Sequence, residues 1–411
     1  METAAITSAK HILLLVGTIL AVGSLSGLLA RKFRLPDVVV FLLVGILVGP
    51  EILGLISVRA DSTFNQLILI FGSCYILFDG GASLRLSVLK EVWITIVVIS
   101  TIGVLISMAI TGLAATWLLG LPMVTALLLG ASIASTDPAT LVPVFRQVKI
   151  KERVAQTVMS ESAFNDAMGA ITTFAVLGVA MGTGTFSLGA AAFDLVSNAL
   201  VGLLAGAILG YAAAFLIAHE KFSFLMEYAP LVTLMSVAGA YLAAEGFHGS
   251  GFMAVFVFGI MLGNKESFGF AMEQGEQEKL ADFVATTALI MRMFIFILLG
   301  SQVSFSLVGK YLVGGTLLVL VFMLVGRPIT VFACALPDRR SKWSLKELLF
   351  MCWTRETGVI PGALAGILIG MRAPGAEVIA SVTFLAILIT ILLQATTTRW
   401  LAGKLGLLEE G

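Results

Sequence analysis

The 411-residue sequence has few charged residues and few cysteines. Asp, Glu, Lys and Arg make up 12% of the chain, whereas hydrophobic residues make up 59%. Soluble domains have about 25% charged and about 45–50% apolar residues, so a water-soluble core could not bury this much apolar surface. Acidic and basic residues are equal in number, 25 each, which excludes the basic surplus of a nucleic-acid-binding protein. The three cysteines lack the paired spacing of a disulfide framework or a metal site.

Long apolar segments fill nearly the whole chain. A helix needs about 20 mainly apolar residues to cross the hydrocarbon of a bilayer. We therefore predict an all-α polytopic membrane protein with about 13 transmembrane helices. The predicted spans are 12–30, 36–57, 64–82, 92–118, 121–146, 155–182, 189–218, 228–245, 249–263, 282–303, 308–335, 345–371 and 375–401.

The loops between these spans differ in positive charge. With thirteen spans, most Lys and Arg residues fall on one side of the membrane, and cytoplasmic loops carry an excess of these residues. We predict a multi-pass protein of the cell (inner) membrane with its N-terminus outside and its C-terminus in the cytoplasm. The basic residues predicted on the outer side are Lys10, Arg59, Lys310 and Arg372.

Several ionisable residues lie inside the predicted spans. Each costs at least about 2.5–3.5 kcal/mol to insert, so each is a candidate functional residue. Acids outnumber bases among them, so some carboxylates would lack a protein counter-charge and would have to bind a cation or a proton. Competition between the two is the chemistry of exchange. These residues are Asp79, Asp137, Glu161, Asp166, Arg292, Arg327, Arg355 and Glu356.

The densest polar cluster begins the predicted sixth span. On a helix, Glu161 lies one turn from Asn165, and Ser162 lies one turn from Asp166, which gives two adjoining polar stripes. Hydroxyl, amide and carboxylate oxygens suit a hard alkali cation better than a transition metal. The alternative is a polar patch that only holds helices together.

Two predicted spans are interrupted by proline and polar residues, at 134–140 and at 355–362. Irregular backbone at membrane depth is tolerated where it is buried in protein or lines a cavity. Broken segments at corresponding places of two halves are typical of inverted-repeat transporters, so we predict two crossing discontinuous helices. Simple proline kinks are the alternative. The residues assigned to the breaks are Thr136, Asp137, Pro138, Arg355, Glu356, Thr357, Gly358 and Pro361.

These motifs resemble a known family. The Thr136-Asp137-Pro138 break and the Glu161–Asp166 stretch are similar to those of NhaP-type sodium/proton antiporters of bacteria and archaea, the electroneutral branch that is related to animal sodium/proton exchangers. The resemblance covers nearly the whole chain. Weaker matches are LLVGILVGPEILG, LFDGGASL, SGFMAVFVFGIMLGN and FIFILLG.

The resemblance implies roles for individual residues. Asp166 would bind the cation or the proton in turn, and Asn165 before it marks the electroneutral branch. Glu161 would form a structural ion pair with Arg327, and Asp79 matches an acidic residue of the third span. Thr357 departs from the arginine that many relatives have before the glycine of the second break. The implied cation ligands are Asp166, Asp137, Ser162 and the Thr136 carbonyl.

We therefore expect a secondary antiporter that exchanges one Na⁺ for one H⁺ by alternating access, with Li⁺ or K⁺ as alternative cations. A cation channel and a sodium-coupled symporter are rival classes. The sequence has no phosphate-binding GxxxxGK[ST] loop, and we expect no cofactor. It also lacks the Gly-x-Gly-Asp motif of an intramembrane aspartyl protease, so we do not expect an enzyme.

The resemblance further implies a homodimer in membrane lipid and a division into two moving parts. A transport core would move against a scaffold that carries the dimer contacts. The expected division is scaffold 1–91, core 92–183, linking span 184–218, scaffold 219–307 and core 308–411.

Overall fold

The computed structural model describes most of the chain, and its regular structure there is almost all helical. Asp137 and Pro138, which the sequence assigns to the first break, lie outside the described part. The described residues are 4–33, 35, 37–60, 62–136, 145, 150–182, 188–219 and 224–408.

Across this part of the chain, nine helical segments are long and apolar enough to cross a membrane, and four shorter apolar helices accompany them. Together they account for the thirteen predicted spans and confirm the predicted fold class. The long segments are α1 (Ala4–Phe33), α3 (Thr63–Ala82), α4 (Leu86–Leu119), α7 (Glu152–Ala180), α8 (Leu188–Ala218), α9 (Ala229–Gly246), α11 (Gln274–Ser301), α12 (Phe305–Val321) continued by α13 (Arg327–Ala335), and α16 (Ala376–Thr390). The short helices are α2 (Asp37–Val48), α5 (Met123–Ser132), α10 (Gly251–Gly263) and α15 (Val359–Gly370).

The predicted end of the second span is wrong, whereas the break predicted in the twelfth span is confirmed. The second span was predicted to reach residue 57, but α2 ends at Val48, because Gly49 and Pro50 follow and proline cannot continue a helix. In the twelfth span, α14 (Leu345–Trp353) ends before the break and α15 begins after it, as predicted for a discontinuous helix. Pro361 lies inside the first turn of α15. Backbone N–H groups there have no intrahelical acceptor, so the missing N–H of proline costs no helical hydrogen bond.

Glycine lets α2 and α11 cross at backbone contact. A Cβ atom added to Gly45 would lie 2.4 Å from the carbonyl oxygen of Ile297, and one added to Gly300 would lie 2.3 Å from that of Leu42. No side chain fits at such distances, so the crossing requires glycine on both helices. In membranes, small residues of this kind let helices pack closely.

The crossing of α3 with α10 repeats this arrangement. A Cβ atom added to Gly259 would lie 2.4 Å from the carbonyl oxygen of Phe78, and one added to Gly81 would lie 2.3 Å from that of Phe256. Each crossing joins a helix of the first half of the chain to one of the second half, and on every helix the two contacting residues are three positions apart, so the two crossings are equivalent. The equivalent residues are Leu42 and Phe256, Gly45 and Gly259, Phe78 and Ile297, and Gly81 and Gly300.

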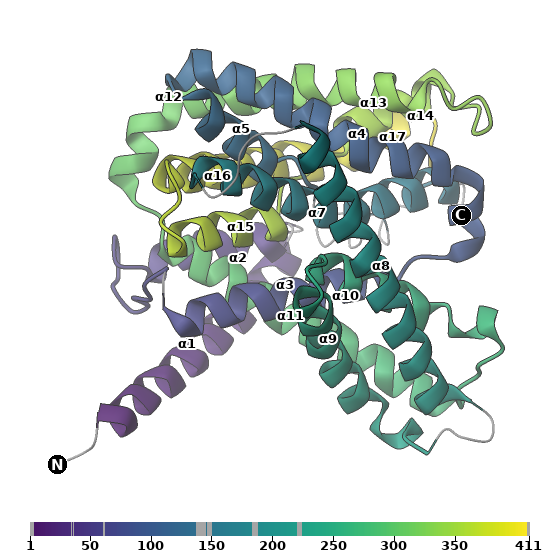
Figure 1. Cartoon of the computed structure of the whole chain (residues 1–411). Coiled ribbons are helices and arrows are strands. Elements are labelled where there is room, and N and C mark those ends of the chain that lie inside the picture. The colour runs from purple at the N-terminus through teal and green to yellow at the C-terminus, as the bar shows by residue number, and fades with distance from the viewer. Residues whose placement is uncertain are drawn as a thin grey trace.

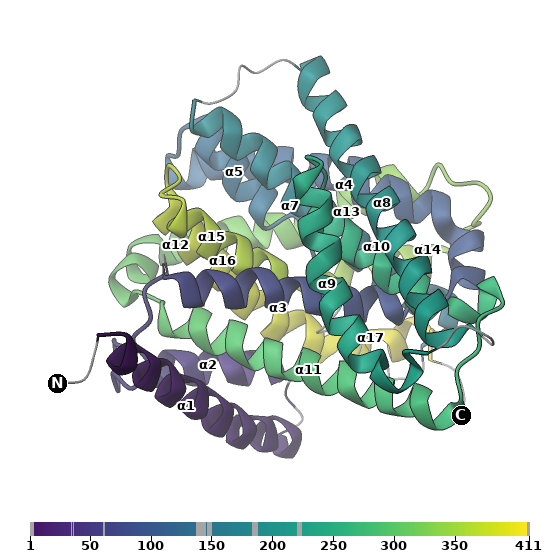
Figure 2. The same cartoon turned by 60° about the horizontal axis from the view of Figure 1, so that its bottom comes forward.

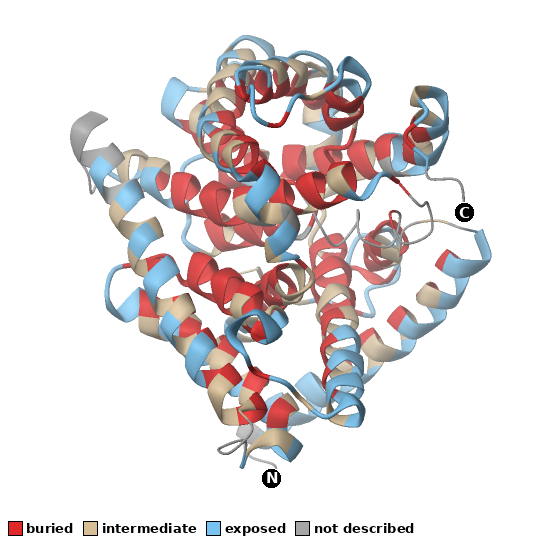
Figure 3. Ribbon diagram, turned by 90° about the vertical axis from the view of Figure 1, so that its right-hand side faces the viewer, coloured by how far each residue is buried: buried red, intermediate tan, exposed pale blue. Residues whose placement is uncertain are grey.

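Burial separates central from peripheral helices. α1 lies at the periphery in two views of the molecule (Figures 1 and 2), and α1, α8 and α9 have the smallest buried shares among the long segments. Buried residues gather along the inner helices, whereas exposed residues follow the outer faces (Figure 3). The exposed side chains of α1 are largely apolar, such as Leu13 and Leu14, as expected of a surface in contact with lipid.

Candidate cation site

The site begins where α5 breaks. This helix ends at Ser132, whose hydroxyl donates to the carbonyl oxygen of Leu129 at 2.9 Å. In a continuous helix the carbonyl of Ala134 would accept from the residue four positions later, which is Pro138 and has no N–H. The break therefore leaves a carbonyl oxygen available to another donor.

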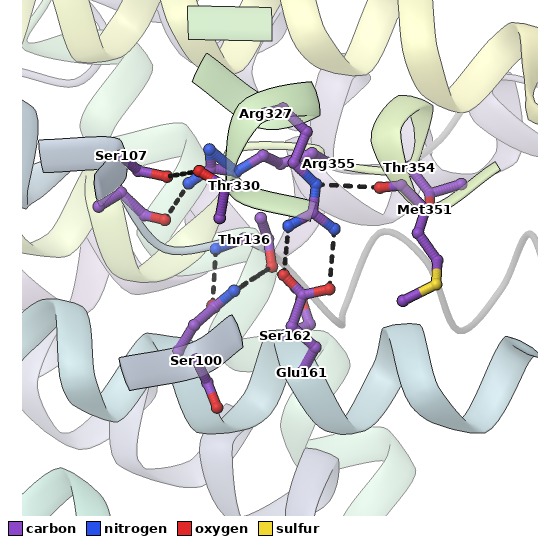
Figure 4. A network of polar contacts seen from close by, with 12 residues as sticks. Ser100, Ser107, Thr136, Glu161, Ser162, Arg327, Thr330, Met351, Thr354 and Arg355 are labelled. Carbon is purple, nitrogen blue, oxygen red and sulfur yellow. Dashed lines mark hydrogen bonds and ion pairs between the residues drawn. The ribbon is translucent and has the colours of Figure 1, made fainter. Parts of the chain in front are cut away.

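α7 holds the residue that follows this break. The backbone N–H of Thr136 donates to Oδ1 of Asn165 at 2.9 Å, and Nδ2 of Asn165 donates to Oγ1 of Thr136 at 2.9 Å. The hydroxyl of Ser162 lies 2.7 Å from the Thr136 hydroxyl (Figure 4). One asparagine side chain thus replaces the helical partner that the broken backbone has lost.

The cluster is buried and rich in oxygen. Thr136, Ser162, Asn165 and Asp166 each expose 2% of their surface or less. Hydroxyl, carbonyl and carboxylate oxygens are the ligands of hard monovalent cations. The part of the chain that the structure describes contains no group of three or more His, Cys, Asp or Glu residues that could hold a metal ion.

An ion pair lies beside this cluster (Figure 4). Nη1 of Arg327 donates to Oε1 of Glu161, and Nη2 donates to Oε2 at 2.8 Å. Nε donates to the carbonyl oxygen of Met351 at 2.9 Å, near the C-terminal end of α14. Both charged residues are 1% exposed. The arginine therefore neutralises Glu161 and also satisfies a carbonyl that the end of α14 leaves without a helical donor.

A π-helical turn precedes Arg327. This turn, η3 (Phe322–Gly326), joins α12 to α13, and Pro328 follows it directly after the arginine. The extra residue of a π turn rotates the helix that follows it, and such turns are frequent at functional sites. The turn accommodates the proline, which cannot donate to the preceding helical turn.

Arg355 connects the two broken spans. Its guanidinium donates to the carbonyl oxygen of Ala134, the oxygen that Pro138 cannot serve, and stacks 4.1 Å from the ring centroid of Phe322. Arg355 is 2% exposed. The sequence did not predict this contact, because nothing local links two residues so far apart in the chain.

The remaining predicted residues lie around this cluster. Asp79 is on α3, which packs against α7. Glu356 and Thr357 are fully buried in the segment between α14 and α15, where the Thr357 N–H donates to Oγ1 of Thr390 at 3.0 Å. Arg292 lies away from the breaks, on α11, with Nε 3.5 Å from Oδ2 of Asp37 at the start of α2.

The sequence did not indicate two buried polar residues, one at the end of α16 and one in the turn that follows this helix. Thr390 caps the second break, and Gln394, which is fully buried, lies in the π-helical turn η4 (Ile391–Ala395). A search restricted to ionisable residues passes over both. A hydroxyl and an amide one turn apart in an otherwise apolar span would have been a usable signal.

Comparison with known proteins decides the family. The model of the sodium/hydrogen exchanger transmembrane family matches residues 17–404. The chain belongs to the sodium/hydrogen exchanger family. This is a family of membrane transporters, and with its apolar helices the chain is a multi-pass membrane protein.

Individual relatives agree with this assignment. Na⁺/H⁺ antiporter 1 of Methanocaldococcus jannaschii is 32% identical, over 95% of this chain and 95% of its own. The K⁺/H⁺ antiporter NhaP of Alkalimonas amylolytica is 28% identical, over 95% of this chain and 66% of its own. The structure of the sodium proton antiporter MjNhaP1 from M. jannaschii at pH 8 superimposes with a TM-score of 0.82, over 95% of this chain and 97% of that one. The helix arrangement is therefore that of this exchanger family.

Proposed function

We propose that this protein is a sodium/proton antiporter in which Asp166 binds a cation and a proton in turn. One observation carries the proposal: Thr136, Ser162 and Asn165 form a buried, hydrogen-bonded cluster at a helix break, and the buried Asp166 lies on α7 one turn from Ser162. In a chain of the exchanger family, such a cluster is a suitable cation site. Burial of the carboxylate favours either a proton or a cation upon it, because an uncompensated buried charge is costly.

The ligands that we propose for the cation are oxygens of residues at the first break and on α7. They are the Asp166 carboxylate, the Ser162 hydroxyl, the carbonyl of Thr136 and the carboxylate of Asp137. Asp79, on the neighbouring α3, would complete the site from the side. The Glu161–Arg327 pair holds α7 against α13 and takes no part in the exchange.

The proposed stoichiometry is one cation for one proton. Asn165 is neutral, so Asp166 is the only carboxylate of this dipeptide. A carboxylate that carries either one monovalent cation or one proton crosses the membrane in the same charge state both ways. Exchange is then electroneutral, and its direction follows the two ion gradients.

Two moving parts would give alternating access. The proposed core comprises 92–183 and 308–411, and the proposed scaffold comprises 1–91 and 219–307. Both breaks and the Glu161–Arg327 pair belong to the core, and the glycine crossings of α2 with α11 and of α3 with α10 belong to the scaffold. The scaffold would also form a homodimer, in a cell (inner) membrane with the N-terminus outside and the C-terminus in the cytoplasm.

Potassium is the second candidate cation. A relative that aligns with 95% of this chain bears the name K⁺/H⁺ antiporter. The oxygen ligands of the site suit either alkali ion.

Proton movement in proteoliposomes tests the proposal. An acid-inside pH gradient is imposed, then sodium, lithium or potassium salt is added outside and a pH-sensitive dye is followed. We expect a saturable, cation-selective collapse of the gradient that needs no charge-compensating ionophore. A flux that requires an ionophore would refute electroneutral exchange, and no response to any alkali cation would refute antiport.

A matched pair of variants on α7 tests the role of Asp166. Asp166→Asn should reduce exchange to the level of protein-free liposomes, because an amide cannot take up the proton. Glu152→Gln removes a carboxylate of the same helix that is 55% exposed and paired with Arg85, and should leave exchange unchanged. Full activity of Asp166→Asn in a correctly inserted protein would exclude Asp166 as the exchanging group.

A further inference from the structure

The two breaks are held in the same way by the two halves of the chain. Thr136 follows the end of α5 by the same number of residues as Thr357 follows the end of α14. Each threonine donates its backbone N–H to a side chain one span later, Thr136 to Asn165 at 2.9 Å and Thr357 to Thr390 at 3.0 Å. Asn165 and Thr390 are therefore equivalent capping residues of an internal repeat.

This equivalence places Gln394 next to the second break. One turn after its capping residue, the first half has Gly169, whose added Cβ would lie 3.0 Å from Cβ of Ser135. The residue equivalent to Gly169 in the second half is Gln394, and the residue equivalent to Ser135 is Glu356. The repeat thus directs a glutamine side chain toward a buried carboxylate at a place where the first half has no side chain.

Three buried polar side chains at the second break and on the helix that follows it have no hydrogen-bond partner among the described residues. Neither amide atom of Gln394 has a hydrogen-bond partner among the described residues, and the same holds for the hydroxyls of Thr357 and Thr383. All three residues are fully buried. Thr383 lies two helical turns before Thr390 and about 16 Å along the helix from Gln394, so its hydroxyl is too far away to share a ligand with the Gln394 amide. Buried polar atoms are generally satisfied by protein or by ordered water.

We propose that Gln394 and Thr357, together with the Glu356 carboxylate, bind buried water that bridges the η4 turn to the second break. A buried water needs two to four polar partners, which this set supplies. Water fits better than a second alkali cation, because the buried guanidinium of Arg355 adjoins Glu356 and would repel another positive charge.

The bridging water gives Gln394 a positioning role. It ties η4 to the segment that carries Arg355, and the Arg355 guanidinium donates to the carbonyl of Ala134, two residues before Thr136. Removing the water would loosen this segment and shift the carbonyl oxygen of Thr136, a proposed cation ligand. This role rests on the proposed exchange at Asp166, whereas the water site itself does not.

An experimental structure at a resolution that places water tests the binding site. We expect density within hydrogen-bond distance of the Gln394 amide and the Thr357 hydroxyl, and its loss in Gln394→Met. A direct hydrogen bond from Gln394 to Glu356 with no water between them would overturn the proposal. Anomalous density after soaking with thallium(I) at this cluster would also overturn it, because the ligand would then be a cation.

Exchange kinetics test the positioning role. In Gln394→Met we expect the KM for the cation to rise about fivefold, the effect of one lost hydrogen bond, with little change in the maximal rate. The control is Gln302→Met, since Gln302 donates to Asn65 at 2.8 Å away from both breaks and its loss should leave KM unchanged. If Gln394→Met does not insert, Thr357→Val makes the same test.

An unchanged KM in the Gln394→Met or Thr357→Val protein would refute the positioning role. Wild-type protein that exchanges no cation would instead refute the proposed function and leave the water site to be judged by its density.

Discussion

The buried ion pair between Glu161 and Arg327 allows a sharp prediction of stability. Both residues are 1% exposed, and the arginine directs two of its donors at the carboxylate. In Glu161→Met the guanidinium stays buried and keeps its bond to the Met351 carbonyl, but it loses its counter-charge. Breaking a buried pair in this way costs about 3–5 kcal/mol.

The double variant Glu161→Met, Arg327→Met should be far less damaging. It removes both charges and replaces them with apolar side chains, a change that is often neutral in protein interiors. The carbonyl of Met351 then loses its donor, which costs about 1 kcal/mol. The double variant should therefore be about 2–4 kcal/mol more stable than Glu161→Met alone.

The assay is equilibrium unfolding of the purified protein in detergent micelles. The exposed pair of Arg85 and Glu152, with side chains 68% and 55% exposed, is the control, and Glu152→Met should cost at most about 1 kcal/mol. The reasoning would be refuted if Glu161→Met lowered the free energy of unfolding no more than this control does. It would also be refuted if the loss in the double variant equalled the sum of the losses in Glu161→Met and Arg327→Met.

Two further predictions concern the loop after α13 and the glycine crossings. Burial raises the pKa of Asp338, but hydrogen bonds from Thr95 and from its own turn outweigh burial and bring the pKa below its ordinary value. The ionised Asp338 therefore stabilises the fold above the ordinary carboxyl pKa, and this stabilisation is lost as the pH falls through the lowered pKa. Acid unfolding profiles should show this loss in the wild type and not in Asp338→Asn, and identical profiles would contradict it. Gly45→Ala should destabilise by about 1–3 kcal/mol, because the new methyl group meets the Ile297 carbonyl, whereas Gly27→Ala, with open space around it, should cost nothing in the same unfolding assay.

The sequence by itself determined the class of the protein and the places where its helices break. A bilayer imposes rules that can be read locally, because each span must be apolar over about 20 residues and each charge within it is costly. The charges within spans and the two proline-containing segments were therefore visible without a structure. Thr136, Ser162 and Asn165, selected on these grounds, lie together in the fold.

Contacts between distant segments were decided by the tertiary structure. The partner of Arg292 is Asp37. Asp37 begins a helix, where an acidic residue is common and does not indicate a buried ion pair in the sequence. The Arg355 guanidinium donates to the carbonyl of Ala134, and the Thr390 hydroxyl accepts from the Thr357 N–H at the second break although the sequence around Thr390 is apolar. Such contacts depend on how the helices cross. The crossings in turn depend on glycines that allow backbone contact. Which glycines have this role depends on the helix that packs against them.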